Sequence, residues 1–169
     1  MKRIYPYVGP NEIRDAVTGA SERFQITTVS DVLHWAASNP SDANTATFVI
    51  DTDGELWIAD RRSEHVACAR TEPVLSAGEI TFAFDGNIVS VDYLTNQSTG
   101  YCPEPQSFPA VSFALDRAGI PAPDDFAVQC VFRRCKCGQI NIVKNDLLEC
   151  VVCGADLPLY YNVKPQDGE

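Results

Sequence analysis

Apolar and polar residues alternate along the middle of the chain, which is typical of β-strands that place one face against a core. Two short segments rich in aspartate and glycine, residues 51–54 and 85–87, interrupt this pattern and favour tight turns. We expect the flanking strands to form two hairpins of one antiparallel sheet, with one buried and one more polar face. The predicted strands are residues 24–28, 47–50, 56–59, 80–84 and 88–94. The predicted core residues of the sheet are Phe48, Ile50, Phe82 and Val91.

Helical patterns flank these strands. The predicted helices are residues 11–18, 31–38 and 107–118. For the second helix, Ser30 is a suitable N-cap, and Val32 and Trp35 lie on its apolar stripe. We expect the helices to cover one face of the sheet. The predicted fold class is therefore α+β, an antiparallel sheet with flanking helices and a small C-terminal unit.

Four cysteines near the C-terminus form two close pairs, and a glycine follows each pair. The pairs are Cys135 with Cys137 and Cys150 with Cys153. Two tight bends of this kind bring four thiolates together, as Zn²⁺ prefers in a structural site, and a glycine tolerates the positive φ of the bend. The spacer over residues 139–149 is long enough for one hairpin. The spacing predicts a zinc ribbon whose closed four-cysteine site gives Zn²⁺ a structural role.

Three alternatives remain open for these cysteines. The first pair has one intervening residue instead of two, so Cys130 could replace Cys135 or Cys137 as a ligand. Two disulfides, or free thiols in a core, would also account for them. A proline-rich linker follows Gly119, so we expect an α+β domain at residues 1–123 and the zinc ribbon at residues 124–169. A strand over residues 126–132 should lead into the ribbon.

Composition and charge restrict the partners. The chain has 169 residues and a formal net charge of -10, which argues against nucleic acid as the main partner because phosphate binding needs concentrated lysine and arginine. The N-terminal residues lack the apolar stretch of a signal peptide, and no apolar run reaches the length of a membrane helix. Seven cysteines, four of them assigned to a metal, fit a reducing cytoplasm.

Two polar segments, residues 61–68 and 96–105, each directly follow the second strand of a hairpin. If these hairpin ends lie side by side, they gather side chains that can bind a ligand. The predicted ligand-binding residues are Arg62, His65, Asn96, Ser98 and Tyr101, with Glu64 and Cys102 nearby. The catalytic candidates are His65, Tyr101, Glu79 and Glu104. The alternative is that these residues form turns and satisfy one another's hydrogen bonds.

The same segments carry a resemblance to a known module. The residues concerned are His65-Val66-Ala67-Cys68-Ala69, Glu72-Pro73-Val74-Leu75-Ser76-Ala77-Gly78-Glu79-Ile80, Asp85-Gly86, and Asn96-Gln97-Ser98-Thr99-Gly100-Tyr101-Cys102-Pro103. This pattern resembles a His-Ser-Ser-Phe-Leu-Ala-Gly and Ser-Gly-His-Tyr module that occurs in plant IQ-motif calmodulin-binding proteins and in bacterial toxin-like proteins. Uncharacterised bacterial proteins that append a zinc ribbon to this module are also similar. The resemblance covers roughly residues 47–119.

The resemblance implies a shared fold and pocket, and it names no reaction. The residues that match the module's motifs are His65, Gly78, Glu79, Ser98, Tyr101 and Pro103. Gly100 stands where the module has its second histidine, so an activity that needs this histidine does not carry over. No basic calmodulin-binding helix is evident, so calmodulin binding does not carry over either.

Two functions are expected from these observations. A closed metal site, an acidic chain and the missing histidine favour a small cytoplasmic zinc-ribbon protein that acts as a binding, accessory or regulatory module, with a protein partner. The alternative is an enzyme of the transferase or glycohydrolase type acting on a small nucleotide such as NAD. In that enzyme, His65 and Tyr101 would hold the nucleotide, and Glu79 or Glu104 would stabilise developing positive charge.

Overall fold

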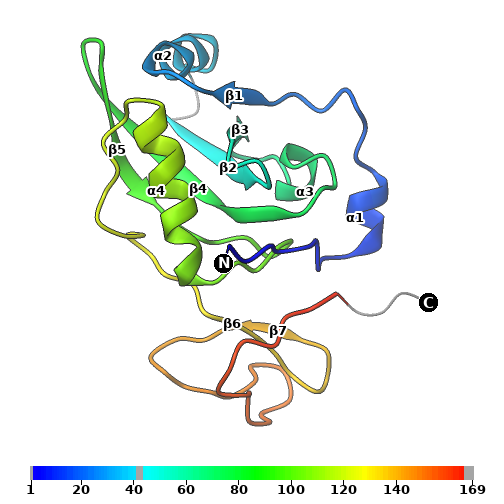
Figure 1. Ribbon diagram of the computed structural model, residues 1–169. Helices are drawn as coiled ribbons and strands as arrows, with labels where there is room; N and C mark the ends of the chain where they lie inside the picture. The colour runs from blue at the N-terminus through cyan, green and yellow to red at the C-terminus, as the bar shows by residue number, and fades with distance from the viewer. Residues whose placement is uncertain (1, 41–43, 166–169) are drawn as a thin grey trace.

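The computed structural model describes residues 2–40 and 44–165. Its centre is a five-stranded antiparallel sheet with the strand order β1-β3-β2-β4-β5 (Figure 1). The strands are β1 (Phe24–Ile26), β2 (Thr45–Asp51), β3 (Leu56–Asp60), β4 (Val74–Asp85) and β5 (Ile88–Leu94). Both predicted hairpins lie in this sheet, which confirms the α+β class.

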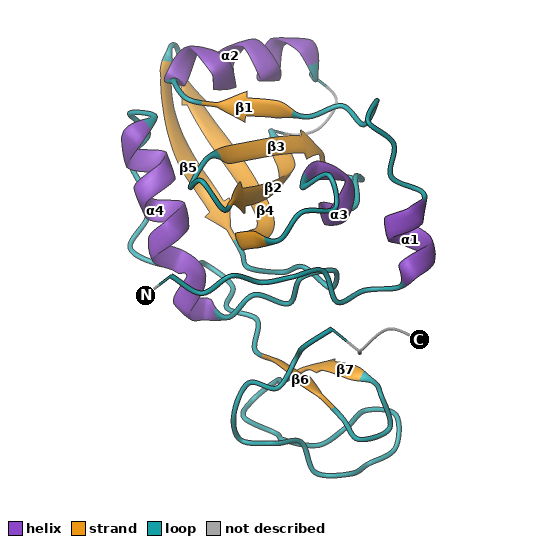
Figure 2. Cartoon of the chain, turned by 45° about the vertical axis from the view of Figure 1, so that its right-hand side comes forward, coloured by secondary structure: helices purple, strands orange, loops and turns teal. Residues whose placement is uncertain are grey.

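Other parts of the chain cover both faces of the main sheet. The helices are α1 (Asn11–Asp15), α2 (Val29–Ser38), α3 (His65–Cys68) and α4 (Phe108–Arg117), with a short 3₁₀ turn, η1 (Pro105–Ser107), before α4. Helices α2 and α4 pack on one face, and α3 lies on the other (Figure 2). The prediction of helices on one face only is wrong, because β2 is buried on both sides. Its Phe48 packs toward α2 and α4, whereas Val49 packs toward α3.

The core of the first face follows the predicted pattern. Phe48, Ile50 and Phe82 are almost completely buried, as predicted, whereas Val91 is half-buried. Val91 pairs with Phe82, and the register shifts beside this pair so that Asp92 is an extra residue on β5. Strand β5 lies at the edge of the main sheet and has a neighbouring strand on one side only. Val91 is therefore less enclosed than residues of the central strands.

The N-terminal helices differ from the prediction at their ends. Helix α1 ends at Asp15 rather than at residue 18, and the N-cap of α2 is Thr28 rather than Ser30. The Thr28 hydroxyl accepts a hydrogen bond from the Asp31 backbone N–H, and the Asp31 carboxylate accepts one from the Thr28 N–H at 3.0 Å. This capping box satisfies two backbone donors at once, so α2 begins earlier than a Ser30 cap would allow.

Strands β3 and β5 run in opposite directions, because β3 is antiparallel to β2, β2 to β4, and β4 to β5. The polar segments that follow β3 and β5 therefore leave the main sheet at opposite ends, and the prediction that these ends lie side by side is wrong. The chain still brings both segments to one face. Val66 of α3 and Tyr101, which follows β5, belong to the same apolar cluster as Tyr5.

Residues 132–157 form a small second unit, here called the C-terminal unit. Its two-stranded sheet pairs β6 (Phe132–Arg134) with β7 (Ile140–Ile142), below the main sheet in the view of Figure 1. The hairpin expected within residues 139–149 is therefore wrong, because β7 pairs with the strand that precedes the first cysteine pair. The predicted strand over residues 126–132 is mostly irregular, with one parallel bridge between Thr95 and Val128, and strand structure begins at Phe132.

A small apolar cluster and one buried asparagine join the C-terminal unit to the main sheet. The cluster consists of Cys102, Cys130, Phe132 and Val163. Beside it, the Asn96 side chain donates to the Cys130 carbonyl at 2.9 Å and accepts from the Cys130 N–H at 2.7 Å. Within the described ranges, every helix is too short or too polar to span a lipid bilayer.

Candidate functional site

The four predicted ligand cysteines come together in the C-terminal unit. The Sγ atoms of Cys135, Cys137, Cys150 and Cys153 all lie within 4.8 Å of one another. The Sγ of Cys135 is 3.5 Å from that of Cys153, and the Sγ of Cys137 is 3.8 Å from that of Cys150. In a tetrahedral site with Zn–S bonds of about 2.3 Å, the sulfur atoms lie about 3.8 Å apart. The cluster therefore has the dimensions of a four-thiolate metal site.

Two backbone bends position these cysteines. The Gly138 N–H donates to the Cys135 carbonyl at 2.8 Å, and the Gly154 N–H donates to the Cys150 carbonyl at 2.9 Å. Both glycines have positive φ, 97° and 73°, which a residue with a Cβ adopts at a cost. The glycines after each cysteine pair thus close the bends, as the sequence predicted.

Two of the three alternatives for the cysteines, disulfide bonds and Cys130 as a ligand, find no support in this arrangement. All seven cysteines are free, and the shortest Sγ separations in the cluster are well above the roughly 2.05 Å of a disulfide bond. Cys130 lies outside the group of four, in the apolar cluster with Cys102 and Phe132. Within the group, Cys135 and Cys150 are buried, whereas Cys137 and Cys153 are exposed.

One buried polar residue that the sequence pattern did not single out touches this cluster. Asn141, in the centre of β7, places its side-chain amide nitrogen 3.5 Å from the Cys150 Sγ. The backbone N–H of Cys153 is the main cause that lowers the pKa of Cys150, and the Val152 N–H and the Asn141 amide lower it further. These donors favour the thiolate form that binds metals.

His65, the first candidate of the other predicted site, has a hydrogen-bond partner inside the fold. It is the first residue of α3, and its Nε2 lies 2.8 Å from the Gly78 carbonyl oxygen. Burial lowers the pKa of the imidazole, which keeps it neutral at neutral pH.

Tyr101, Ser98 and Asn96 are buried, and each has a hydrogen-bond partner. The Tyr101 hydroxyl donates to the Glu72 carbonyl at 2.7 Å, and burial raises its pKa. The Ser98 hydroxyl accepts from the Tyr101 N–H at 3.3 Å, and Asn96 holds Cys130 as described above. His65 and Tyr101 are therefore each hydrogen-bonded to a different backbone carbonyl.

The remaining candidates come from three separate segments of the chain and differ in exposure. Arg62 is exposed and faces Asp60 at 3.5 Å. Glu104 pairs with Arg3 and accepts from the Tyr5 hydroxyl at 3.3 Å. Glu79 is half-buried on β4.

Cys102, which directly follows Tyr101, is buried in the apolar cluster with Cys130 and Phe132. Burial raises the pKa of Cys102 to about 12, so its thiol is a poor nucleophile at neutral pH.

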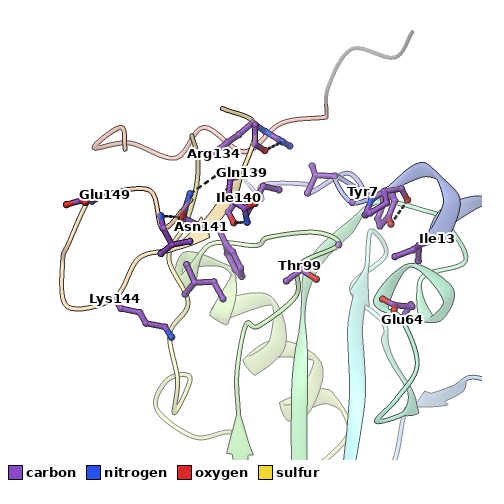
Figure 3. Close-up of a pocket in the computed structure, with 18 of the residues that line it drawn as sticks. Tyr7, Ile13, Glu64, Thr99, Arg134, Gln139, Ile140, Asn141, Lys144 and Glu149 are labelled. Carbon is purple, nitrogen blue, oxygen red and sulfur yellow. Dashed lines mark hydrogen bonds between the residues drawn. The ribbon is translucent and has the colours of Figure 1, made fainter. Parts of the chain in front are cut away.

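A cleft of about 750 Å³ lies between the C-terminal unit and the N-terminal segment (Figure 3). Figure 3 shows Arg134, Ile140 and Asn141 on one side, and Tyr7 and Ile13 on the other. Its lining includes Glu64, Thr99 and Gly100, the chain neighbours of the predicted pocket residues, and excludes His65, Ser98 and Tyr101. Sequence reasoning overlooked Tyr7 and Val8 of the N-terminal segment and Asn141 of β7, which line this cleft but belong to none of the motifs.

No protein-family model, curated protein or solved structure matches this chain. The resemblance to the plant and bacterial module therefore rests on the short motifs quoted above. The structure itself supports an antiparallel sheet followed by a C-terminal four-cysteine cluster.

Proposed function

We propose that Cys135, Cys137, Cys150 and Cys153 bind one Zn²⁺ ion and that the protein acts as a zinc-ribbon binding module with an accessory or regulatory role. The observation that carries the zinc proposal is the set of four Sγ atoms within 4.8 Å of one another. The group consists of four cysteine thiols, without a carboxylate or an imidazole. Four cysteine thiolates are a ligand set typical of structural zinc sites. Four protein ligands leave no coordination position for a substrate, so the metal supports folding rather than catalysis.

The need for a metal follows from the small core of the C-terminal unit. Around the cysteines, the buried residues are Cys135, Cys150 and Leu157, with Val143, Leu148 and Ala155 partly buried beside them. So few apolar side chains offset little of the entropy that folding costs. Metal binding supplies the missing stabilisation, as it does in other small metal-dependent units.

The binding role is supported by the cleft beside the C-terminal unit. Ile140, Ile142 and Leu147 supply apolar surface there, and Arg134 and Lys144 supply positive charge. Leu147 and Val151, which both line the cleft, are 63% and 82% exposed. Exposed apolar side chains of this size, next to charged ones, are typical of surfaces that bind another protein.

The enzyme alternative has weaker support. It requires a nucleotide pocket around His65 and Tyr101, with Glu79 or Glu104 close to the reacting bond. His65 and Tyr101 each use their polar atom on a backbone carbonyl, and Glu104 pairs with Arg3. A nucleotide would have to displace these contacts to reach the same groups.

Metal analysis tests the zinc proposal. We expect about one zinc ion per chain in freshly purified protein that has not been exposed to chelators. The Cys150→Ser variant should lose this zinc, whereas the Cys130→Ser variant should retain it, since Cys130 lies outside the cluster. Folded wild-type protein without any metal would contradict the proposal, and zinc loss on Cys130→Ser would reassign a ligand.

A thermal-shift panel of nucleotides, NAD included, separates the binding module from the enzyme. A ligand that binds the folded state alone stabilises it by about 2.7 kcal/mol at a hundredfold excess over Kd. The accessory role predicts an unchanged melting temperature across the panel. A reproducible rise with one nucleotide, abolished by Tyr101→Phe, would favour the enzyme instead.

A further inference from the structure

We propose that Asn141 is a positioning residue of the metal centre, which donates a hydrogen bond to the Cys150 thiolate and thereby sets the affinity of the site for its metal. This inference rests on the proposed four-cysteine zinc site. It concerns a residue that no cysteine motif contains and that lies nine positions before the sulfur it contacts.

Asn141 is 3% exposed, and both the nitrogen and the oxygen of its side-chain amide have hydrogen-bond partners. Its oxygen accepts from the Val151 N–H at 3.0 Å, and its nitrogen lies 3.2 Å from the Gln139 carbonyl and 3.5 Å from the Cys150 Sγ. The Val151 N–H can only donate, so the amide oxygen must face Val151. This requirement turns both N–H groups of the amide toward the Gln139 carbonyl and the sulfur.

The position of Asn141 on β7 explains why this contact is available. Ile140 and Ile142 point to the opposite side of the strand, where both pack near Phe132. Asn141 therefore points from the β6–β7 hairpin toward the bend that carries Cys150 and Cys153. A polar side chain buried at this point would cost stability unless its partners were fixed, and all three partners belong to the metal-binding loops or to β7 itself.

The chemical consequence is a sulfur that has donors from both the backbone and a side chain. The Val152 N–H lies 3.4 Å from the Cys150 Sγ, so the Asn141 amide adds a side-chain hydrogen bond to a backbone one. Donors to a ligating sulfur reduce its negative charge and hold it in the orientation that the metal requires, and loss of such outer contacts typically costs 10–100-fold in metal affinity. Cys150 is thus oriented by a group from the other half of the metal-binding unit.

Cobalt titration of the full-length protein tests this inference. In Asn141→Asp, the carboxylate can still accept from the Val151 N–H but places a negatively charged oxygen against the sulfur. We expect about 10–100-fold weaker Co²⁺ binding and a shift of the thiolate-to-cobalt charge-transfer band to lower energy, because the sulfur has lost its donor.

Asn162 offers a matched control in the same part of the chain. Its side chain bridges the backbone N–H and carbonyl of Arg134, both at 2.8 Å, so Asn162→Asp perturbs the fold without touching a thiol. Asn162→Asp should leave the charge-transfer band at the wild-type energy even if binding weakens. A band at the wild-type energy in Asn141→Asp would overturn the proposal, since a purely structural asparagine would change the affinity alone.

A second measurement needs no variant. In protein loaded with ¹¹³Cd²⁺, a hydrogen bond from Asn141 to a cadmium-bound sulfur should transmit scalar coupling between ¹¹³Cd and a side-chain amide proton of Asn141. Coupling to the Val152 backbone proton without coupling to Asn141 would reject the inference. If the wild-type protein binds neither zinc, cobalt nor cadmium, the zinc proposal itself fails, which is a separate outcome.

Discussion

The Nε2 atom of His65 lies 2.8 Å from the backbone carbonyl oxygen of Gly78. A carbonyl can only accept, so the hydrogen of this contact is on Nε2, and the imidazole joins α3 to the centre of β4. The imidazole of His65, which the sequence motifs suggested as a catalytic group, therefore forms a hydrogen bond that links α3 to the main sheet. This contact makes the role of His65 testable through stability as well as through binding.

The pH dependence of stability should reveal this histidine. Burial lowers its pKa in the folded state below the ordinary 6.5, so the unfolded chain binds a proton that the folded chain does not. The contribution of His65 is then fully present above about pH 6.5 and is lost as the pH falls toward the folded-state pKa. Urea unfolding between pH 7.5 and 5.5 should show a smaller loss of stability in His65→Gln than in wild type, with the metal kept saturated. Equal losses in the two proteins would mean that His65 titrates normally in the folded state.

The hydroxyl of Tyr101 should contribute to folding. Tyr101→Phe removes the 2.7 Å hydrogen bond to the Glu72 carbonyl, and we expect it to lower the free energy of unfolding by about 0.5–1.5 kcal/mol. Tyr160 is 80% exposed, so Tyr160→Phe is a matched control that should change nothing measurable. Unchanged stability in Tyr101→Phe, together with lost ligand binding, would restore the case for a functional pocket.

Two of the predicted core residues, Phe48 and Val91, should differ in how much stability is lost when each is replaced by alanine. Phe48→Ala removes a side chain that is 0% exposed and should cost about 3–5 kcal/mol. Val91→Ala removes a smaller, half-buried side chain on the edge strand and should cost about 1 kcal/mol. Equilibrium denaturation measures both. A larger cost for Val91 than for Phe48 would show that the packing of β5 is misjudged.

Helix α2 should depend on Thr28 and not on Ser30. Thr28→Ala breaks the capping box with Asp31 and should cost about 1 kcal/mol, measured by thermal or chemical unfolding. Ser30→Ala, at an exposed position inside the helix, should be close to neutral. The N–H groups of Thr27 and Thr28 also lower the pKa of Asp31, so the contribution of the cap should fade as acid protonates the carboxylate. A reversed order of the two alanine variants would place the cap at Ser30.

Removing the metal should open one part of the chain. The C-terminal unit has few buried apolar residues, whereas the main sheet has a large core against α2 and α4. With a strong chelator, backbone amides of β6 and β7 should exchange with deuterium much faster, while those of β2 and β4 stay protected. Hydrogen exchange read by mass spectrometry resolves these segments. Protection of β6 and β7 that survives complete metal removal would show that the unit folds without it.

The alternating pattern of β4 and β5, the turn residues at 51–54 and 85–87, and the spacing of the cysteine pairs were sufficient to predict the two hairpins of the main sheet and the four-cysteine cluster. Both features are local. The side-chain period of a strand and the two bends at Gly138 and Gly154 depend on residues within a few positions of one another. The same locality explains the error at α2, where two good caps, Thr28 and Ser30, lie two residues apart and the capping box decides between them.

The tertiary structure decided everything that joins distant residues. Strand order sends the segments after β3 and β5 to opposite ends of the main sheet, and packing then returns α3 and Tyr101 to one face. Helix α3 has four residues, too few for a periodic signal. From the sequence alone, an asparagine between two isoleucines would be placed on the solvent-facing side of a strand. In the fold Asn141 is buried, with its amide nitrogen 3.5 Å from the Cys150 sulfur. A polar side chain acts through the partner it meets, and that partner is determined by the packing of the whole chain.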